Sequence, residues 1–246
     1  MPVTSEYYRP DLAYVHDQSY TDLARSAALH LSDLLKDRNN SGDLIVDLGS
    51  GSGVLAKALG EQNFKVIGID YSPDMVKLAE GNAPDAEFIV ASFLDYALPR
   101  CAAVTAIGEV LNYRFDKKHN FETLVDLFRK VYEQLEHGGI FLFDLIEPGI
   151  EGIMTESNKI VEGDDWTMFL HLFEDWESAT LTREITLFRK VGEFYRKSYE
   201  EHRVQLLHHH KVQSALEEIG FSVELINQYA DLAFRDKHVG FVARKG

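Results

Sequence analysis

The stretch LIVDLGSGSGVL, residues 44–55, decides the fold of this chain together with VIGID at residues 66–70. An apolar run with the composition of a buried strand breaks into three glycines and restarts as a helix at Val54. A second apolar strand then ends in the carboxylate of Asp70, which is placed to accept hydrogen bonds from both hydroxyls of a ribose. The pattern indicates the first β-α-β unit of a sheet that binds a nucleoside.

Composition limits the classes of function. The chain has 246 residues, 45% of them hydrophobic, which suits one globular domain with an insertion. The formal net charge of −15 opposes binding to nucleic acid or to an anionic membrane, so the expected partner is a small molecule. Residues 1–8 lack the pattern of a secretion signal, and no apolar run is long enough to cross a bilayer. Because Cys101 is the single cysteine, we expect a cytoplasmic protein.

Strands and helices are expected to alternate along the first part of the chain. Strands are expected at 44–48, 65–69, 86–90, 102–107 and 139–145, and helices at 21–37, 53–60, 73–81 and 120–136. Most of these strands are apolar throughout, which predicts a parallel sheet covered on both faces. Right-handed crossovers then make the architecture a doubly wound α/β fold.

The pattern changes after Gly149. Three strand-like stretches rich in aromatic residues follow without helices between them, at 166–174, 181–191 and 194–207. A helix at 211–219 and strands at 222–227 and 238–244 complete the chain. We therefore expect N-terminal helices and a core domain over 1–149, an inserted antiparallel β meander over 150–207, and the rest of the core over 208–246.

The glycine turn does not fit two well-known phosphate-binding motifs. A P-loop ends in Gly-Lys-Ser/Thr, but in this chain Gly53 is followed by Val54 and Leu55. The dinucleotide fingerprint G-x-G-x-x-G/A fits only from Gly51 to Ala56, late in the turn, so NAD is disfavoured. Asp70 could instead be the N-cap of the helix expected at 73–81, but Ser72 is better placed for that role.

Four ordered blocks of the chain resemble the class I S-adenosylmethionine-dependent methyltransferases. The blocks are IVDLGSGSG with VIGIDYSPDM, FIVASF, AIGEVLNY and LEHGGIFLFD, at residues 45–53 with 66–75, 88–93, 106–113 and 135–144. The resemblance spans residues 40–147 and resumes at 211–246. It implies a Rossmann-like sheet of seven strands in which the last strand runs antiparallel.

The resemblance implies a set of cofactor-binding residues. Gly49 and Gly51 would lie against the methionine portion of S-adenosylmethionine, Asp70 would hold the ribose and Tyr71 would flank the adenine. Many members have an acidic residue at the position of Ser92. Serine is a weaker acceptor for the adenine amino group. The full expected set is Tyr14, Arg25, Asp47, Gly49, Ser50, Gly51, Gly53, Asp70, Tyr71, Met75, Ser92, Phe93 and Gly108.

Several of these positions have distinct expected roles. Asp47 would stand behind the glycine loop, and Gly108 would face the amino group and the sulfonium. The backbone N–H of Phe93 would reach the adenine. Tyr14 and Arg25 belong to leading helices that fold over the cofactor as a lid, with Arg25 near its carboxylate.

Catalytic groups are harder to name, because displacement at a sulfonium depends mainly on positioning. His16 is the first candidate for a general base, since a histidine titrates near neutrality. Asn112 and Tyr113 follow the fourth strand, where the acceptor should lie, and Glu109 is another option. The run His208–His210 is not expected to bind a metal, because consecutive side chains point in different directions.

The expected function is methyl transfer from S-adenosylmethionine to nitrogen or oxygen of a small metabolite. Residues 150–207 would form one wall of the acceptor pocket. Three alternatives stay open: a nicotinamide-dependent oxidoreductase, a non-catalytic module that binds an adenosyl cofactor, and a nucleic-acid methyltransferase. The acceptor and the oligomeric state stay open too, with a homodimer among the options.

Overall fold

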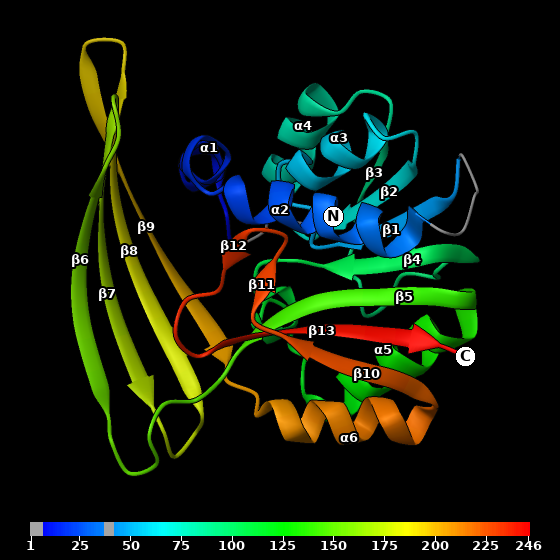
Figure 1. Ribbon diagram of the computed structural model, residues 1–246. Helices are drawn as coiled ribbons and strands as arrows, with labels where there is room; N and C mark the ends of the chain where they lie inside the picture. The colour runs from blue at the N-terminus through cyan, green and yellow to red at the C-terminus, as the bar shows by residue number, and fades with distance from the viewer. Residues whose placement is uncertain (1–6, 37–41) are drawn as a thin grey trace.

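A central sheet of seven strands organises the computed structural model, which describes residues 7–36 and 42–246 (Figure 1). The order across the sheet is β10-β13-β5-β4-β1-β2-β3. The strands are β1 (Leu44–Leu48), β2 (Lys65–Asp70), β3 (Glu87–Val90), β4 (Cys101–Ala106), β5 (Leu135–Ile146), β10 (Phe221–Ile226) and β13 (His238–Lys245). The five strands β1 to β5 are parallel, and β13 is antiparallel to both β5 and β10. The predicted fold class is confirmed, including the antiparallel last strand.

Helices cover both faces of this sheet (Figure 1). They are α2 (Asp22–Leu35), α3 (Val54–Gly60), α4 (Pro73–Asn82), α5 (Phe121–Gln134) and α6 (His209–Ile219). One apolar core joins the sheet to α5 and α6, and a second joins it to α2 and α3. All six residues of β4 are buried, as expected of a central strand covered on both sides. The helix expected at 21–37 spans Asp22–Leu35, and residue 37 lies outside the described residues.

A separate four-stranded antiparallel sheet follows the central β5. Its strands are β6 (Thr155–Glu162), β7 (Trp166–Asp175), β8 (Thr180–Val191) and β9 (Phe194–Gln205), in the order β6-β7-β8-β9. Figure 1 shows it standing beside the core at the carboxyl ends of the parallel strands. We expected three strands here and missed β6, because its sequence TESNKIVE is mostly polar and exposed. Two residue pairs, β11 (Gln228–Tyr229) and β12 (Leu232–Ala233), form a further short hairpin.

The first helix, α1 (Pro10–Ser19), lies between the core and this second sheet (Figure 1). Leu12 and Val15 pack with Trp166, Met168 and other apolar residues of β7 and β8 in one small core. On its other side, the carboxylate of Asp17 accepts a hydrogen bond from Asn82 of α4. The helix therefore ties the second sheet to the core.

None of the helices in the part of the chain that the structure describes is long and apolar enough to cross a membrane.

Candidate active site

The turn after β1 contains three glycines with positive φ, at Gly49, Gly51 and Gly53. A Cβ on Gly49 would lie 2.5 Å from a methyl carbon of Val110, and one on Gly53 would lie 3.0 Å from Ala79 of α4. These two glycines allow close packing within the protein. A Cβ on Gly51 would meet no protein atom within 4 Å. Of the three, Gly51 is the one that borders open space.

Asp70 ends β2 and faces this turn. Its carboxylate accepts hydrogen bonds from the backbone N–H of Gly51 and of Ser72, both at 2.8 Å. Burial raises the pKa of Asp70 to about 6, although those N–H donors act in the opposite direction. A carboxylate offers about four lone-pair positions, so two remain for further donors. The side-chain oxygen of Ser72 accepts from the Met75 N–H and caps α4, as the sequence indicated.

Asp47 stands behind the turn, as the family resemblance implies. Its carboxylate accepts a 2.7 Å hydrogen bond from Thr105, and its side chain is buried. Burial raises the pKa of Asp47 to about 7, and the nearby charge of Asp70 adds to that rise. Ser50 is buried as well, and its hydroxyl has no hydrogen-bond partner among the described residues.

A second open glycine, Gly108, follows β4. Its φ is +89°, and a Cβ there would meet no protein atom within 4 Å. The carboxylate of Asp144 accepts from the backbone N–H of Gly108 at 2.9 Å and of Glu109 at 2.8 Å, and from the hydroxyl of Tyr229 at 3.0 Å. Burial raises the pKa of Asp144 to about 6. Asp144 therefore fixes the backbone at the end of β4.

Aromatic rings gather beyond Asp70. The rings of Tyr71 and Phe115 lie 5.1 Å apart, and those of Phe93 and Phe115 lie 5.0 Å apart. Beside them, the hydroxyl of Ser92 donates a 2.9 Å hydrogen bond to Asp116. The structure thus brings together Tyr71, Ser92 and Phe93, three residues expected around the adenine.

Three residues of the expected cofactor set lie elsewhere. The Tyr14 hydroxyl points to Asp165 at 3.3 Å, and the guanidinium of Arg189 lies 3.4 Å from the centre of its ring. Tyr14 therefore contacts the second sheet and not the glycine turn. Arg25 is exposed on α2. The side chain of Met75 is 1% exposed and belongs to the protein interior. Tyr14 lies on the side of α1 that faces β7 and β8, and these contacts do not support its expected role at the cofactor.

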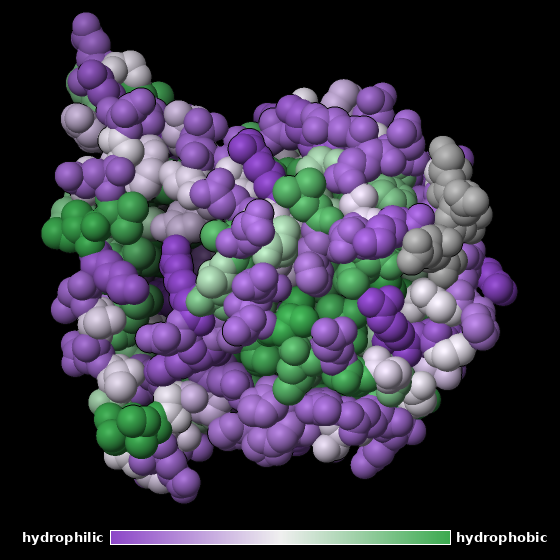
Figure 2. Space-filling model, in the orientation of Figure 1, coloured by the Kyte–Doolittle hydropathy of each residue, from purple (hydrophilic) through white to green (hydrophobic). Residues whose placement is uncertain are grey.

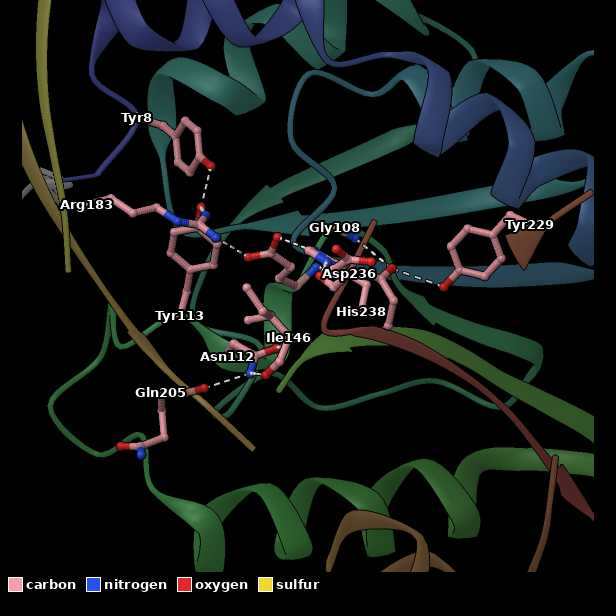
Figure 3. Close-up of polar contacts among 12 residues, drawn as sticks. Tyr8, Gly108, Asn112, Tyr113, Ile146, Arg183, Gln205, Tyr229, Asp236 and His238 are labelled. Atoms are coloured by element: carbon pink, nitrogen blue, oxygen red, sulfur yellow. Dashed lines mark hydrogen bonds and ion pairs between the residues drawn. The ribbon is translucent and has the colours of Figure 1, made fainter. Parts of the chain in front are cut away.

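The catalytic candidate Tyr113 belongs to a polar cluster built from distant parts of the chain (Figure 3). Its hydroxyl lies 2.9 Å from that of Tyr8 and accepts a 2.8 Å hydrogen bond from Arg183 of β8. Arg183 also donates to the carboxylate of Glu109, whose other oxygen lies 2.6 Å from Nε2 of His238. Burial alone would raise the pKa of Glu109, but Arg183 and His238 lower it to about 2. We call these five residues the Glu109 cluster.

Asn112 does not fit a catalytic role. Its amide donates to the carbonyls of Ile146 and Gln205 and accepts from the Ile146 N–H, and the side chain is fully buried (Figure 3). These bonds join the end of β5 to the end of β9. The residue is a structural tie between the central sheet and the second sheet.

His16 lies among aromatic rings. Its ring contacts those of Tyr8, at a centroid distance of 5.2 Å, and Tyr20, at 5.5 Å. Burial lowers the pKa of His16 to about 4, so the imidazole is neutral near pH 7 and would hold a proton only weakly. Nearby, the buried His202 contacts Tyr7 and Tyr8 and lies 2.9 Å from Glu200.

Four residues of this region were missed at the sequence level: Tyr8, Arg183, His238 and Asp144. Arg183 is 74 positions from its partner Glu109, and His238 is 129 positions away. No local pattern connects residues so far apart. Asp144 is the last residue of the block LEHGGIFLFD, which resembles the family. Its position near the carboxyl end of a predicted strand is the sequence feature that could have marked it as a site residue. The histidine run lies at the start of α6, where His209 pairs with Glu147 at 2.8 Å.

Comparisons with known proteins agree with this geometry. Residues 45–139 match the family of methyltransferase domains. The putative methyltransferase YqeM of Bacillus subtilis is 25% identical over 190 residues, which cover 74% of this chain and 74% of that protein. A crystal structure of an S-adenosylmethionine-dependent methyltransferase from Clostridium acetobutylicum has a TM-score of 0.79 and 18% identity, with 96% of this chain and 98% of that one covered. The sugar N-methyltransferase KedS8 from Streptoalloteichus has a TM-score of 0.73 and 17% identity, with 100% and 96% covered.

The residues at the carboxyl ends of β1, β2 and β4 fit S-adenosylmethionine. Gly51 and Gly108 leave open the two places where a Cβ would stand in the way, and Asp70 keeps free acceptor positions between Gly51 and the aromatic rings. Asp70 would hold the ribose, and the backbone at Gly108 would meet the methionine portion. The matched family also decides against the nicotinamide alternative, which shares only the first β-α-β unit. The methyltransferase domain over residues 45–139, the fold and the relatives together show an S-adenosylmethionine-dependent methyltransferase.

Proposed function

We propose that this enzyme transfers a methyl group from S-adenosylmethionine to an amine nitrogen of a small hydroxylated metabolite, such as an amino sugar. The Glu109 cluster carries the proposal. It begins one residue after the open Gly108, at the point where the N-terminal segment, the core and the second sheet converge. The cluster therefore stands where an acceptor would face the reactive methyl group.

The chemistry of the cluster suits a hydroxylated acceptor. Tyrosine hydroxyls both donate and accept hydrogen bonds, and a guanidinium presents several donors. Tyr8, Tyr113 and Arg183 together offer such groups from three segments of the chain. Arg183 and Glu109 neutralise each other, with side chains only 19% and 14% exposed. A neutral polar acceptor would bind here without an unpaired charge in the site.

The reaction itself needs alignment and a place for one proton. S-adenosylmethionine, when bound, supplies a methyl group on a positively charged sulfur. Held by Asp70 and the backbone at Gly51 and Gly108, it would give this methyl group to the lone pair of the acceptor nitrogen and leave as S-adenosylhomocysteine, and the nitrogen would give up one proton. Burial lowers the pKa of His16 to about 4, so its imidazole is neutral near pH 7. We propose that it accepts a hydrogen bond from the N–H of the acceptor and orients the nitrogen, and that the released proton passes to solvent.

The comparisons and the charge of the chain support a small acceptor. The sugar N-methyltransferase KedS8 shares the fold over nearly the whole length of both chains. The net charge of −15 opposes a nucleic-acid substrate. We propose further that residues 150–207 form one wall of the acceptor site and that the enzyme works in the cytoplasm.

A panel of matched acceptors tests the proposal. Amino sugars and the same sugars with a hydroxyl in place of the amine are incubated with the enzyme and S-adenosylmethionine. We expect release of S-adenosylhomocysteine and a mass gain of one methyl group with the amino sugars only. Tyr113→Phe should raise KM for the acceptor and leave cofactor affinity unchanged. Methylation of the hydroxyl sugars alone, or of none of the panel, would overturn the proposed acceptor class.

A further inference from the structure

The position of Ser92 raises a question about adenine recognition. A neutral hydroxyl is a weak acceptor for the exocyclic amino group of adenine, compared with a carboxylate. In the structure this hydroxyl does not stand alone, because it donates a 2.9 Å hydrogen bond to Oδ2 of Asp116. The other oxygen of Asp116 accepts from the backbone N–H of Lys118, also at 2.9 Å.

The sheet register places this pair beside the ribose position. Asp70 of β2 is paired with Val90 of β3, and the N–H of Ala91 donates to the carbonyl of Asp70 at 3.0 Å. Ser92 follows directly, at the same edge of the sheet. A nucleoside held by Asp70 would therefore have its base on the side of Ser92 and Asp116.

Aromatic rings lie beside this pair. Phe115, next to Asp116 in the chain, has its ring 5.1 Å from that of Tyr71 and 5.0 Å from that of Phe93. Stacking on aromatic rings is a common way to hold a base. The carboxylate of Asp116 thus comes from the same loop as one of the rings.

We propose that Asp116 is the acidic residue that recognises the adenine amino group of the cofactor, held in place by Ser92. Each oxygen of its carboxylate uses one lone pair on Ser92 or Lys118, which leaves a second lone pair on each oxygen for an incoming donor. Asp116, which supplies the carboxylate, lies in the loop after β4. Ser92, whose hydroxyl orients that carboxylate, lies just after the end of β3.

Asp95 is the acidic neighbour that provides a control. It lies in the segment after Ser92, and its side chain is 60% exposed. Its carboxylate pairs with the side-chain ammonium of Lys118 at 2.8 Å. Asp95 is thus close to Asp116 in space and equal in charge, but its bonds are made to an exposed lysine.

Binding of S-adenosylhomocysteine, measured by calorimetry, tests the assignment without any methyl acceptor. Loss of one charge-assisted hydrogen bond corresponds to at least about a tenfold weaker affinity. We expect this loss for Asp116→Asn, a smaller loss for Ser92→Ala and unchanged affinity for Asp95→Asn. Unfolding curves of each variant show whether it is folded. The double variant S92D/D116A, which moves the acid to the strand end, should recover affinity relative to D116A.

A cofactor analogue gives a second, independent measurement. In the inosine analogue of S-adenosylhomocysteine, a carbonyl oxygen replaces the amino group, and a carboxylate should reject it. The wild-type protein should therefore prefer the adenosine form, and Asp116→Asn should reduce that preference at least about tenfold, because an amide can donate to the carbonyl. Equal preferences in both proteins would overturn the proposal. An enzyme that binds the cofactor normally but methylates no amine would refute the proposed acceptor and leave this inference standing.

Discussion

Asp70 combines burial with the proposed contact to the ribose, which gives cofactor binding a pH dependence. Burial raises the pKa of Asp70 to about 6. Only the ionised carboxylate accepts from both ribose hydroxyls and from its two backbone donors. We therefore expect the affinity for S-adenosylhomocysteine to be constant near pH 7 and to fall by up to about tenfold per pH unit below 6. Calorimetry at several pH values measures this.

The variant Asp70→Asn separates this effect from other titrations. It should bind the cofactor weakly and with little change between pH 5 and 7. The same shift also affects stability. The pKa of Asp70 in the folded protein lies above its ordinary value of 3.8, so the contribution of this group to stability is present below about pH 4 and is lost as the pH rises toward 6. A wild-type affinity that does not change across this range would contradict the role given to Asp70.

At the scale of single residues, the sequence predicted the parts of the site that belong to local motifs. The strands and the turn that contain Asp47, Gly51 and Asp70 form as the local motifs predicted, and the roles of these three residues toward the cofactor stay predictions. The surroundings of Tyr14 could not be predicted in this way. The segment was recognised, but which side of α1 faces the cofactor depends on β7 and β8, and these strands lie about 150 residues further along the chain.

At the scale of elements, the turn between β1 and α3 separates packing from binding. Gly49→Ala places a Cβ 2.5 Å from Val110, whereas Gly51→Ala places one in open space. Both positions have positive φ, so both substitutions add backbone strain. We expect Gly49→Ala to lose about 1–3 kcal/mol more stability than Gly51→Ala because of the overlap. Gly51→Ala should show the larger loss in affinity for S-adenosylhomocysteine relative to its change in stability.

Urea unfolding and calorimetry on the same two variants give both quantities. The two substitutions are chemically identical and two positions apart, so each is the control for the other. Equal losses of stability, or normal cofactor binding by a folded Gly51→Ala, would contradict this division.

The elements of the central sheet could be predicted because each strand of a covered parallel sheet is a continuous apolar run. Strand β6 gave no such signal. It is the outer strand of the second sheet, and seven of its eight residues are exposed. Its partner β7 was recognised, since Trp166 and Met168 are buried against α1. These strands could be recognised in the sequence where their side chains are buried, because burial requires apolar residues and strand formation alone does not.

At the scale of the whole molecule, three parts of the chain meet at the proposed acceptor site, and α1 holds two of them together. Figure 2 shows the outline indented where the second sheet stands away from the core. The backbone N–H groups of Tyr8 and Arg9, just before α1, donate to the buried Glu200 of β9 at 2.7 and 3.0 Å. The hydroxyl of Ser72, beside Asp70, donates to the carbonyl of Tyr8 at 2.8 Å. The N-terminal segment thus connects the cofactor side of the site with the second sheet.

Asp11 gives the means to test this connection. Its side chain is 7% exposed and accepts from Arg196, at 2.6 Å from Nε, and from Arg189, both on the second sheet. Asp11→Asn should cost about 1–3 kcal/mol of local stability, because it removes the charge that these arginines share. We expect faster hydrogen exchange in residues 10–19, by about tenfold or more, and a higher KM for the acceptor. Asp126→Asn is the matched control, since the side chains of Asp126 and its partner Arg129 are 65% and 57% exposed. If exchange in α1 were as slow in Asp11→Asn as in this control, the other contacts of α1 would be enough to hold it, and the acceptor site would not depend on this ion pair.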